Sequence, residues 1–174
     1  AVNQISRRAE AGEITPEEAL RALEKIEHSL SFRPWQLCVA AAVSSGGFAV
    51  MFGGGVADFF VGVVTAGLVQ ALTCLLGRYR LEGMVSTLVG SFFATLLPLL
   101  FYHFTHVGTV DACVAGALMP LLPGLAMTNA VQDTMRGDIV SGVAHGMNAI
   151  LTATLVAGGA LIASSLYHVL MGGA

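Results

Sequence analysis

Five apolar stretches dominate this sequence, and short polar breaks separate them. They lie at residues 37–52, 59–76, 84–102, 111–122 and 139–170. About 20 helical residues cross a bilayer core of about 30 Å, and a helix satisfies its own backbone hydrogen bonds in lipid. The chain is 55% hydrophobic and 11% charged, whereas soluble domains carry about 25% charged residues. The sequence therefore predicts an all-α polytopic membrane protein with five transmembrane helices.

Most charged residues precede the first apolar stretch. Residues 1–33 hold five of the eight Lys/Arg and six of the eleven Asp/Glu. Among them, Thr15-Pro16-Glu17-Glu18 has the pattern of an N-cap, a first-turn proline and a capping-box glutamate. We predict two domains: a short cytosolic helical hairpin at 1–33 and a five-helix transmembrane domain at 34–174. Because no initiator Met is present, we expect the hairpin to be the end of a larger cytosolic region.

The fourth apolar stretch contains a helix break. Pro123 removes a backbone donor and Gly124 frees the backbone, about 18 Å along the helix at 1.5 Å per residue, so we expect the break near the middle of the bilayer. Past it, Asn129, Asp133 and Arg136 recur on one side of a short half-helix. Irregular backbone at membrane depth needs protein or water as a partner. We therefore expect a pathway or binding site here.

The last helix begins with polar residues and is longer than one span requires. We expect its polar start to reach the same cavity or the cytosolic mouth, through Ser141, His145 and Asn148. The runs of small residues (Ala, Gly and Ser) in this helix are typical of close helix packing.

The cations predict the orientation. With five spans they fall on one side, which should be cytoplasmic: Arg33, Arg78, Arg80 and Arg136. The amino end is then cytoplasmic and the carboxyl end periplasmic or extracellular. Because the number of spans is odd, a second, related five-helix unit would lie inverted beside this one, as in many transporters.

Two other kinds of binding find little support. The net charge of -3 is not arranged as a basic stripe, so we expect no nucleic-acid partner. Three residues have spacing compatible with a metal, but no further ligand follows nearby: His103, His106 and Asp111. We therefore predict no metal and no cofactor. The cysteines lack CxxC spacing and are interpreted as small apolar packing residues: Cys38, Cys74 and Cys113.

An enzyme is also not expected. Ser44, Ser45 and His145 supply a hydroxyl and an imidazole, but the motifs GxSxG and HExxH are both absent.

One motif combination resembles a known family. The run PGLAMTNA at 123–130, followed by Asp133, Gly137-Asp138 and Ser141-Gly142, is similar to the signature region of the threonine/serine exporter family. The GEITPEEAL helix start, the Arg33-Pro34-Trp35 boundary and the order of the spans extend this resemblance over essentially the whole chain.

The resemblance implies an inner-membrane secondary transporter that exports threonine and serine, driven by the proton gradient. It also implies a second five-helix unit, on the same chain or on a separate subunit. The small-residue faces of the last helix need a partner, so we expect assembly with such a unit or as a homo-oligomer. Gln132, His145 and Asn148 depart from the residues expected in many relatives. Small organic acids such as dicarboxylates are therefore an alternative substrate, and a passive channel or a non-transporting scaffold subunit is an alternative function.

For such an exporter, the N–H groups after Pro123-Gly124 are expected to meet the substrate carboxylate. The oxygens of Thr128 and Asn129 and the carboxylate of Asp133 are expected to meet the ammonium.

The sequence leaves several roles open. Thr128 and Asn129 could instead cap a helix end, and Asp133 could simply pair with Arg136. The candidates for proton coupling are Asp133, Asp138, His145 and Asp58. For Asp58, a helix-capping role in the first turn of the second span is the alternative.

Overall fold

The computed structural model describes residues 2–29, 33–78 and 83–172, and every regular element in this part of the chain is helical. Four helices are long and apolar enough to cross a membrane, or five if one bent pair forms a single span. The bent pair is Val110–Leu121 with Gly124–Met135, at 55°. The prediction of an all-α protein whose fourth span is broken at Pro123-Gly124 is confirmed. The chain divides into two compact units, Ala1–Arg33 and Pro34–Ala174.

The first unit is a pair of helices, α1 (Val2–Glu10) and α2 (Pro16–Ser29). The predicted capping box is present: the Thr15 N–H donates to Glu18 Oε2 at 2.9 Å, and the Glu18 N–H donates to Thr15 Oγ1 at 3.2 Å. Gly12, between the helices, has a φ of +70°, which a glycine adopts without strain. Local sequence alone therefore fixes where α2 begins.

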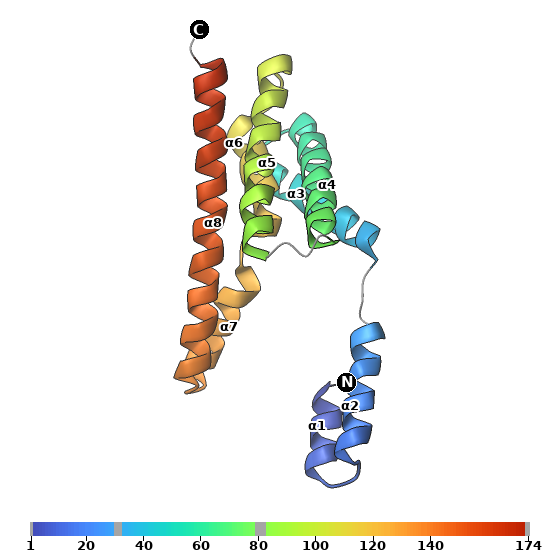
Figure 1. The fold of residues 1–174 in the computed structure, drawn as a ribbon. Coiled ribbons are helices and arrows are strands. Elements are labelled where there is room, and N and C mark those ends of the chain that lie inside the picture. Colours follow the sequence, from blue (N-terminus) through green and yellow to red (C-terminus); the bar gives the residue numbers. More distant parts are fainter. Residues whose placement is uncertain (1, 30–32, 79–82, 173–174) are drawn as a thin grey trace. The chain divides into compact units, whose positions relative to one another are not determined.

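The second unit is a bundle of apolar helices (Figure 1). Its elements are α3 (Pro34–Met51), α4 (Val56–Arg78), α5 (Gly83–Thr105), α6 (Val110–Leu118), the short 3-10 helix η1 (Met119–Leu121), α7 (Gly124–Met135) and α8 (Ile139–Met171). In chain order, helices α3 to α6 form the first part of this bundle. Its last two helices form a second hairpin, the α7–α8 hairpin, whose tip extends beyond the other helices (Figure 1). The long helix α8 packs along α5, and α7 packs beside the first turns of α8, past the ends of the other helices.

Glycines allow close contact between α3, α4 and α6. A Cβ added to Gly62 would lie 3.2 Å from the Gly46 backbone, and one added to Gly116 would lie 2.7 Å from the Ser45 carbonyl oxygen. Helices that approach so closely gain van der Waals contact, which drives association in lipid. These three helices therefore form a tightly packed assembly.

The break follows the buried core of the bundle along the chain. The buried cluster of Val69, Ala94 and Ala117 includes Ala94 from the middle of α5. Pro123 follows Ala117 by six residues, and α7, which begins directly after it, extends past the ends of the other helices (Figure 1). The count along the sequence gave the distance from the start of α6, but not the level at which α6 begins.

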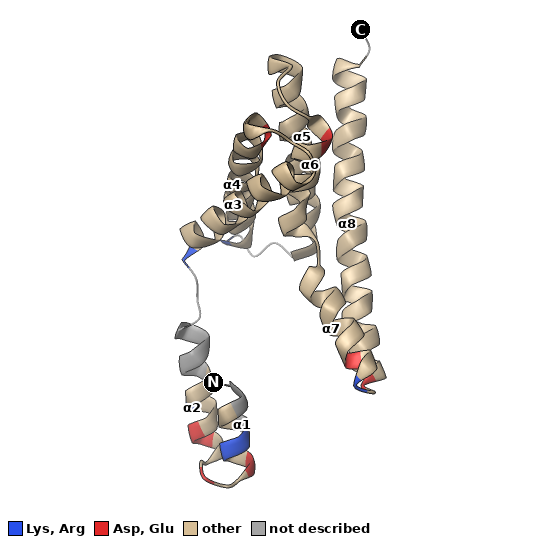
Figure 2. Cartoon of the chain, turned by 180° about the vertical axis from the view of Figure 1, so that it is seen from behind, with Lys and Arg blue, Asp and Glu red and all other residues tan. Residues whose placement is uncertain are grey.

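Charged residues of the second unit lie at its two ends (Figure 2). At one end are the acids that begin α4 and α6, Asp58 and Asp111. At the other are Arg78, which ends α4, and the acid–base cluster of α7 and α8. The two ends thus differ in charge, and the described cations of this unit, Arg78 at the end of α4 and Arg136 at the end of α7, both lie on the side opposite Asp58 and Asp111.

Candidate functional site

The break itself gives α7 an amino terminus without a side-chain cap. Pro123 has φ −80° and ψ 53°, which is not helical, and no side chain caps α7. The Gly124 N–H donates to the Leu122 carbonyl at 2.8 Å, so this donor is already used. The N–H groups of Leu125 and Ala126 lie in the first turn, where a helix has no carbonyl of its own to offer. They are the donors available to an anion.

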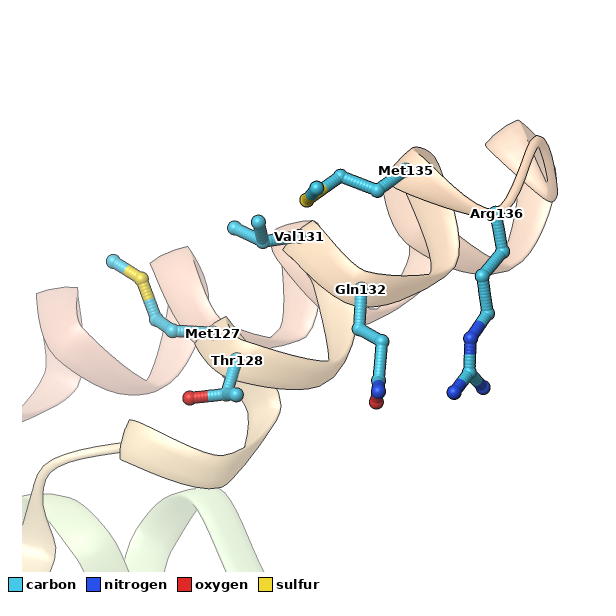
Figure 3. Close-up of a pocket in the computed structure, with 6 residues that line it drawn as sticks. All are labelled: Met127, Thr128, Val131, Gln132, Met135 and Arg136. Atoms are coloured by element: carbon cyan, nitrogen blue, oxygen red, sulfur yellow. The ribbon is translucent and has the colours of Figure 1, made fainter.

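The side chains of helix α7 fall on three faces. An open groove of about 740 Å³ runs along two of these faces (Figure 3). Residues four apart share a face. The polar side chains on one side of the groove are Thr128, Gln132 and Arg136, and the apolar side chains on the other are Met127, Val131 and Met135. The third face packs on α8, where a Cβ on Gly142 would lie 3.0 Å from the Ala130 carbonyl oxygen.

An ion pair connects α7 to α8. His145 Nδ1 lies 2.8 Å from Asp133 Oδ2. The side chains are 48% and 25% exposed, respectively, so water reaches both. Within the described residues this is the ion pair that Asp133 makes, so the alternative pairing of Asp133 with Arg136 is not the one observed. The expectation that His145 reaches the polar region of α7 agrees with this contact.

The predicted substrate residues do not all point to one place. The Thr128 hydroxyl donates to the Gly124 carbonyl at 3.0 Å, which leaves its oxygen free to accept. Asn129 is exposed. Thr128 and Asp133 are five residues apart, or about 140° around a helix. The structure therefore brings Asp133 together with His145, and places Thr128 in the groove.

Two groove residues were not among the predicted substrate residues: Arg136, which was predicted only as part of the polar side of the half-helix, and Gln132. Their signal in the sequence is the spacing of four from Thr128, which places all three on one face. The prediction followed the spacing from Asn129 instead.

Asp138 caps α8. Its Oδ1 accepts a hydrogen bond from the Ser141 N–H at 3.1 Å. A carboxylate at this position also interacts favourably with the helix dipole. This coupling candidate thus has a capping role in the observed fold.

Asp58 is the most enclosed of the candidates, with 2% of the residue exposed. Its Oδ2 accepts from the Gly55 N–H at 2.7 Å, and its Oδ1 accepts from the Thr109 N–H at 2.8 Å. The Cys113 thiol lies 3.1 Å from Oδ1. Gly108, with a φ of +94°, approaches so closely that a Cβ there would meet the carboxylate. Asp58 therefore ties the start of α4 to the loop before α6.

The remaining polar candidates lie elsewhere. Asn148 lines a separate hollow of about 440 Å³ between α5 and α8, with Thr87 and Thr152. His103 Nδ1 lies 3.3 Å from the Tyr167 hydroxyl. The cysteine Cys113 is buried, as a packing residue would be, but its contact with Asp58 was not anticipated.

Comparisons with known proteins agree on one family. The family ThrE, described as "Putative threonine/serine exporter", matches residues 1–167. A "Threonine/serine exporter" of Corynebacterium glutamicum is 28% identical over 178 residues, covering 98% of this chain and 36% of that protein. A "Probable threonine/serine exporter" of Mycobacterium tuberculosis is 25% identical over 159 residues, covering 90% of this chain and 30% of that protein. The chain thus spans about a third of the length of these relatives. No solved structure matches.

Proposed function

Because this chain belongs to the threonine/serine exporter family, a family of transporters rather than enzymes, we propose that it is a membrane unit of a secondary transporter. The unit exports small amino acids, threonine and serine first, by proton antiport. The printed names of both relatives support this substrate.

The observation that carries the proposal is the bent pair of helices followed by a polar half-helix. The 55° bend at Pro123-Gly124 interrupts a span, and α7 then presents polar groups to an open groove. Polar and charged residues are costly in lipid, about 2.5–3.5 kcal/mol for a charge at the centre of a span. A scaffold needs neither feature, whereas many transporters form their substrate site at a broken helix with polar groups.

The chemistry of the groove suits an amino acid, which carries a carboxylate and an ammonium. Arg136 and the free N–H groups that begin α7 offer donors to the carboxylate. The oxygens of Thr128 and Asn129 and the carboxylate of Asp133 offer acceptors to the ammonium. Because Thr128 and Asp133 lie on different sides of α7, a substrate meets them one after the other along its path.

A second five-helix unit, or a second copy of this chain, completes the pathway. Along the groove, α7 exposes Met127 by 54%, Val131 by 60% and Met135 by 83%, and one unit alone leaves the groove open on that side. We place the α7–α8 end in the cytoplasm of a bacterial inner membrane, because Arg78 and Arg136 lie there. The hairpin of residues 1–33 is then cytosolic and the end of α8 is periplasmic or extracellular.

The proposal is tested with the full natural polypeptide that contains this chain, reconstituted in proteoliposomes. Labelled threonine, serine and a dicarboxylate are offered under an imposed pH gradient. Movement of threonine or serine that depends on the gradient is the expected result. Movement of the dicarboxylate alone would reassign the substrate, movement that ignores the gradient would indicate a channel, and no movement of any compound would favour a scaffold.

A further inference from the structure

We infer that the Asp133–His145 pair is the coupling site of this transporter: a proton on His145 and the ammonium group of the substrate compete for the Asp133 carboxylate. This inference rests on the proposed function and deepens it, since it assigns the coupling to one of four candidate groups and states how the two ligands exclude each other.

The geometry of the contact supports competition. The Nδ1 atom of His145 lies 2.8 Å from Asp133 Oδ2, so a neutral imidazole with its hydrogen on Nδ1 donates one hydrogen bond to the carboxylate. Its Nε2 is then free to take up a proton. Protonation at Nε2 converts a neutral donor into a cationic one, which adds a Coulombic attraction to the hydrogen bond that the carboxylate already accepts. The carboxylate is then held by a full positive charge.

Among the charged groups and histidines near it, this pair is the acid and base that we expect to exchange partners. The other charged groups near it on α7 and α8 are Arg136, at the end of α7, and Asp138, which caps α8 through Ser141. The histidines on α5 and α8 besides His145 are His103 and His168, in the last turns of those helices. Imidazole is the side chain that ordinarily titrates near neutral pH. In the described part of α7 and the first turns of α8, His145 is the imidazole, and it contacts Asp133 directly.

Exposure makes the exchange physically accessible. Asp133 is 25% exposed and His145 is 48% exposed, so a proton or a substrate reaches the pair without any unfolding of the α7–α8 hairpin. Asp58, in contrast, is 2% exposed and fully engaged by neighbouring donors. An ammonium group has no route to Asp58 in this fold.

The cycle balances one proton against one substrate molecule. A proton that arrives through the pathway from the outside is taken up by Nε2 of His145, and the imidazolium then holds Asp133 and displaces the substrate ammonium into that pathway. Nε2 then releases that proton to the cytoplasm, and the next ammonium replaces the neutral imidazole on the carboxylate. One proton moves inward for each amino acid that moves outward, and no other reactant is needed.

The test measures the KM for threonine exchange at equal pH on both sides of the membrane, where no gradient drives transport. It uses the full natural polypeptide in proteoliposomes at pH 8 and pH 5.5. In the wild type, proton competition should raise the KM about tenfold between these pH values. His145→Gln, with His145→Asn as a second neutral variant, should have a KM that does not change with pH and resembles the wild type at pH 8. His145→Lys should have a high KM at both pH values, because a permanent cation occupies Asp133. His168→Gln is the matched control and should keep the wild-type pH dependence.

Two results would overturn the inference while leaving the transporter intact: a wild-type KM that does not depend on pH, or neutral His145 variants that keep the wild-type pH dependence. Equal KM values for the Gln and Lys variants would also overturn it. If the wild type shows no saturable threonine exchange at either pH, the proposed function fails, and the inference fails with it.

Discussion

Two acids of the membrane unit, Asp58 and Asp133, show how differently this fold uses a carboxylate. Asp58 is 2% exposed, and its partners are two backbone N–H groups and the Cys113 thiol. Asp133 has a side chain that is 25% exposed, and it pairs with one ionisable partner, His145. Backbone N–H groups hold the Asp58 carboxylate in place, so it does not exchange one partner for another. The partner of Asp133 is an accessible histidine, which another cation can replace. The first arrangement stabilises the fold, and the second is suited to bind and release.

The packing around the two acids follows the same division. Near Asp58, the backbones of α3, α4 and α6 approach through glycines such as Gly46 and Gly62. Near Asp133, α7 packs on α8, and the side chains that face away from that contact are exposed, with Met135 at 83%. The end of the unit that contains Asp58 is therefore tightly packed, whereas the end that contains Asp133 is exposed. The following predictions test that contrast.

The largest effect is expected at Asp58. Replacing Asp58 with Ala leaves its buried donors without an acceptor, at about 1–3 kcal/mol each, so the free energy of unfolding should fall by about 3 kcal/mol or more. Chemical or thermal unfolding of the detergent-solubilised protein measures this loss. Asp111→Ala is the matched control, because Asp111 is exposed in the first turn of α6, and its effect should stay below about 1 kcal/mol. Equal losses in the two variants would contradict the structural role of Asp58.

A smaller loss is expected where α8 is packed against α5. A Cβ on Gly159 would lie 2.5 Å from the Leu88 carbonyl oxygen, whereas one on Gly158 would lie 3.8 Å from its nearest neighbour. Gly159→Ala should therefore destabilise the protein by about 1–3 kcal/mol. Gly158→Ala, and Gly146→Ala in the open half of α8, should be neutral or stabilise by up to about 1 kcal/mol. Unfolding curves of the three variants make the comparison, and a stable Gly159→Ala variant would show that α5 and α8 are not in such close contact.

The Asp133–His145 pair should contribute little to stability. A double-mutant cycle with Asp133→Asn and His145→Gln should give a coupling energy below about 1 kcal/mol, because the pair is accessible to water and salt. A coupling of several kcal/mol would mean that this pair, like Asp58, mainly holds the fold together.

The smallest effect is expected in the hairpin of residues 1–33. The hydrogen bond from the Thr15 backbone N–H, and next the contact with the Thr15 hydroxyl, lower the pKa of the Glu18 carboxyl from its ordinary value. The contribution of a group with a lowered pKa is present above its unfolded-state pKa and is lost as the pH falls through the folded-state pKa. The first turn of α2 should therefore fray below about pH 4.3.

Hydrogen exchange at Ala19, corrected for the intrinsic rate at each pH, measures this fraying. Glu18→Gln should remove the pH dependence, and Glu17→Gln, which changes an exposed neighbour, should keep it. Identical behaviour of the two variants would show that the capping box does not hold the start of α2.

The sequence predicted best where the causes are local. Thr15 and Glu18 are three residues apart, and Pro123 and Gly124 are adjacent, so each device acts through its own neighbours. The partners of Asp58 are Thr109 and Cys113, 51 and 55 residues away, and no pattern near Asp58 names them. The sequence could show a cap at that position, but not the link between two loops.

The candidate site was predicted in part for the same reason. Asp133 and His145 were both named, yet their contact depends on how α7 folds back on α8 at Gly137, which has a φ of +88°. Arg136 was predicted on the face of Asn129 and Asp133, and Gln132 was not predicted as a substrate residue, because helical spacing gives several overlapping faces and packing decides which one is covered. The level of the break likewise depends on where α6 begins in the bundle.

The most direct test of this account is the rate of threonine transport by Asp133→Asn, measured under a pH gradient and divided by the amount of folded protein. The account predicts a variant as stable as the wild type within about 1 kcal/mol, whose transport rate per folded molecule falls at least about tenfold, the factor that a loss of about 1.4 kcal/mol produces. Transport at the wild-type rate in a fully folded Asp133→Asn protein would contradict the claim that the exposed end of the unit carries the function.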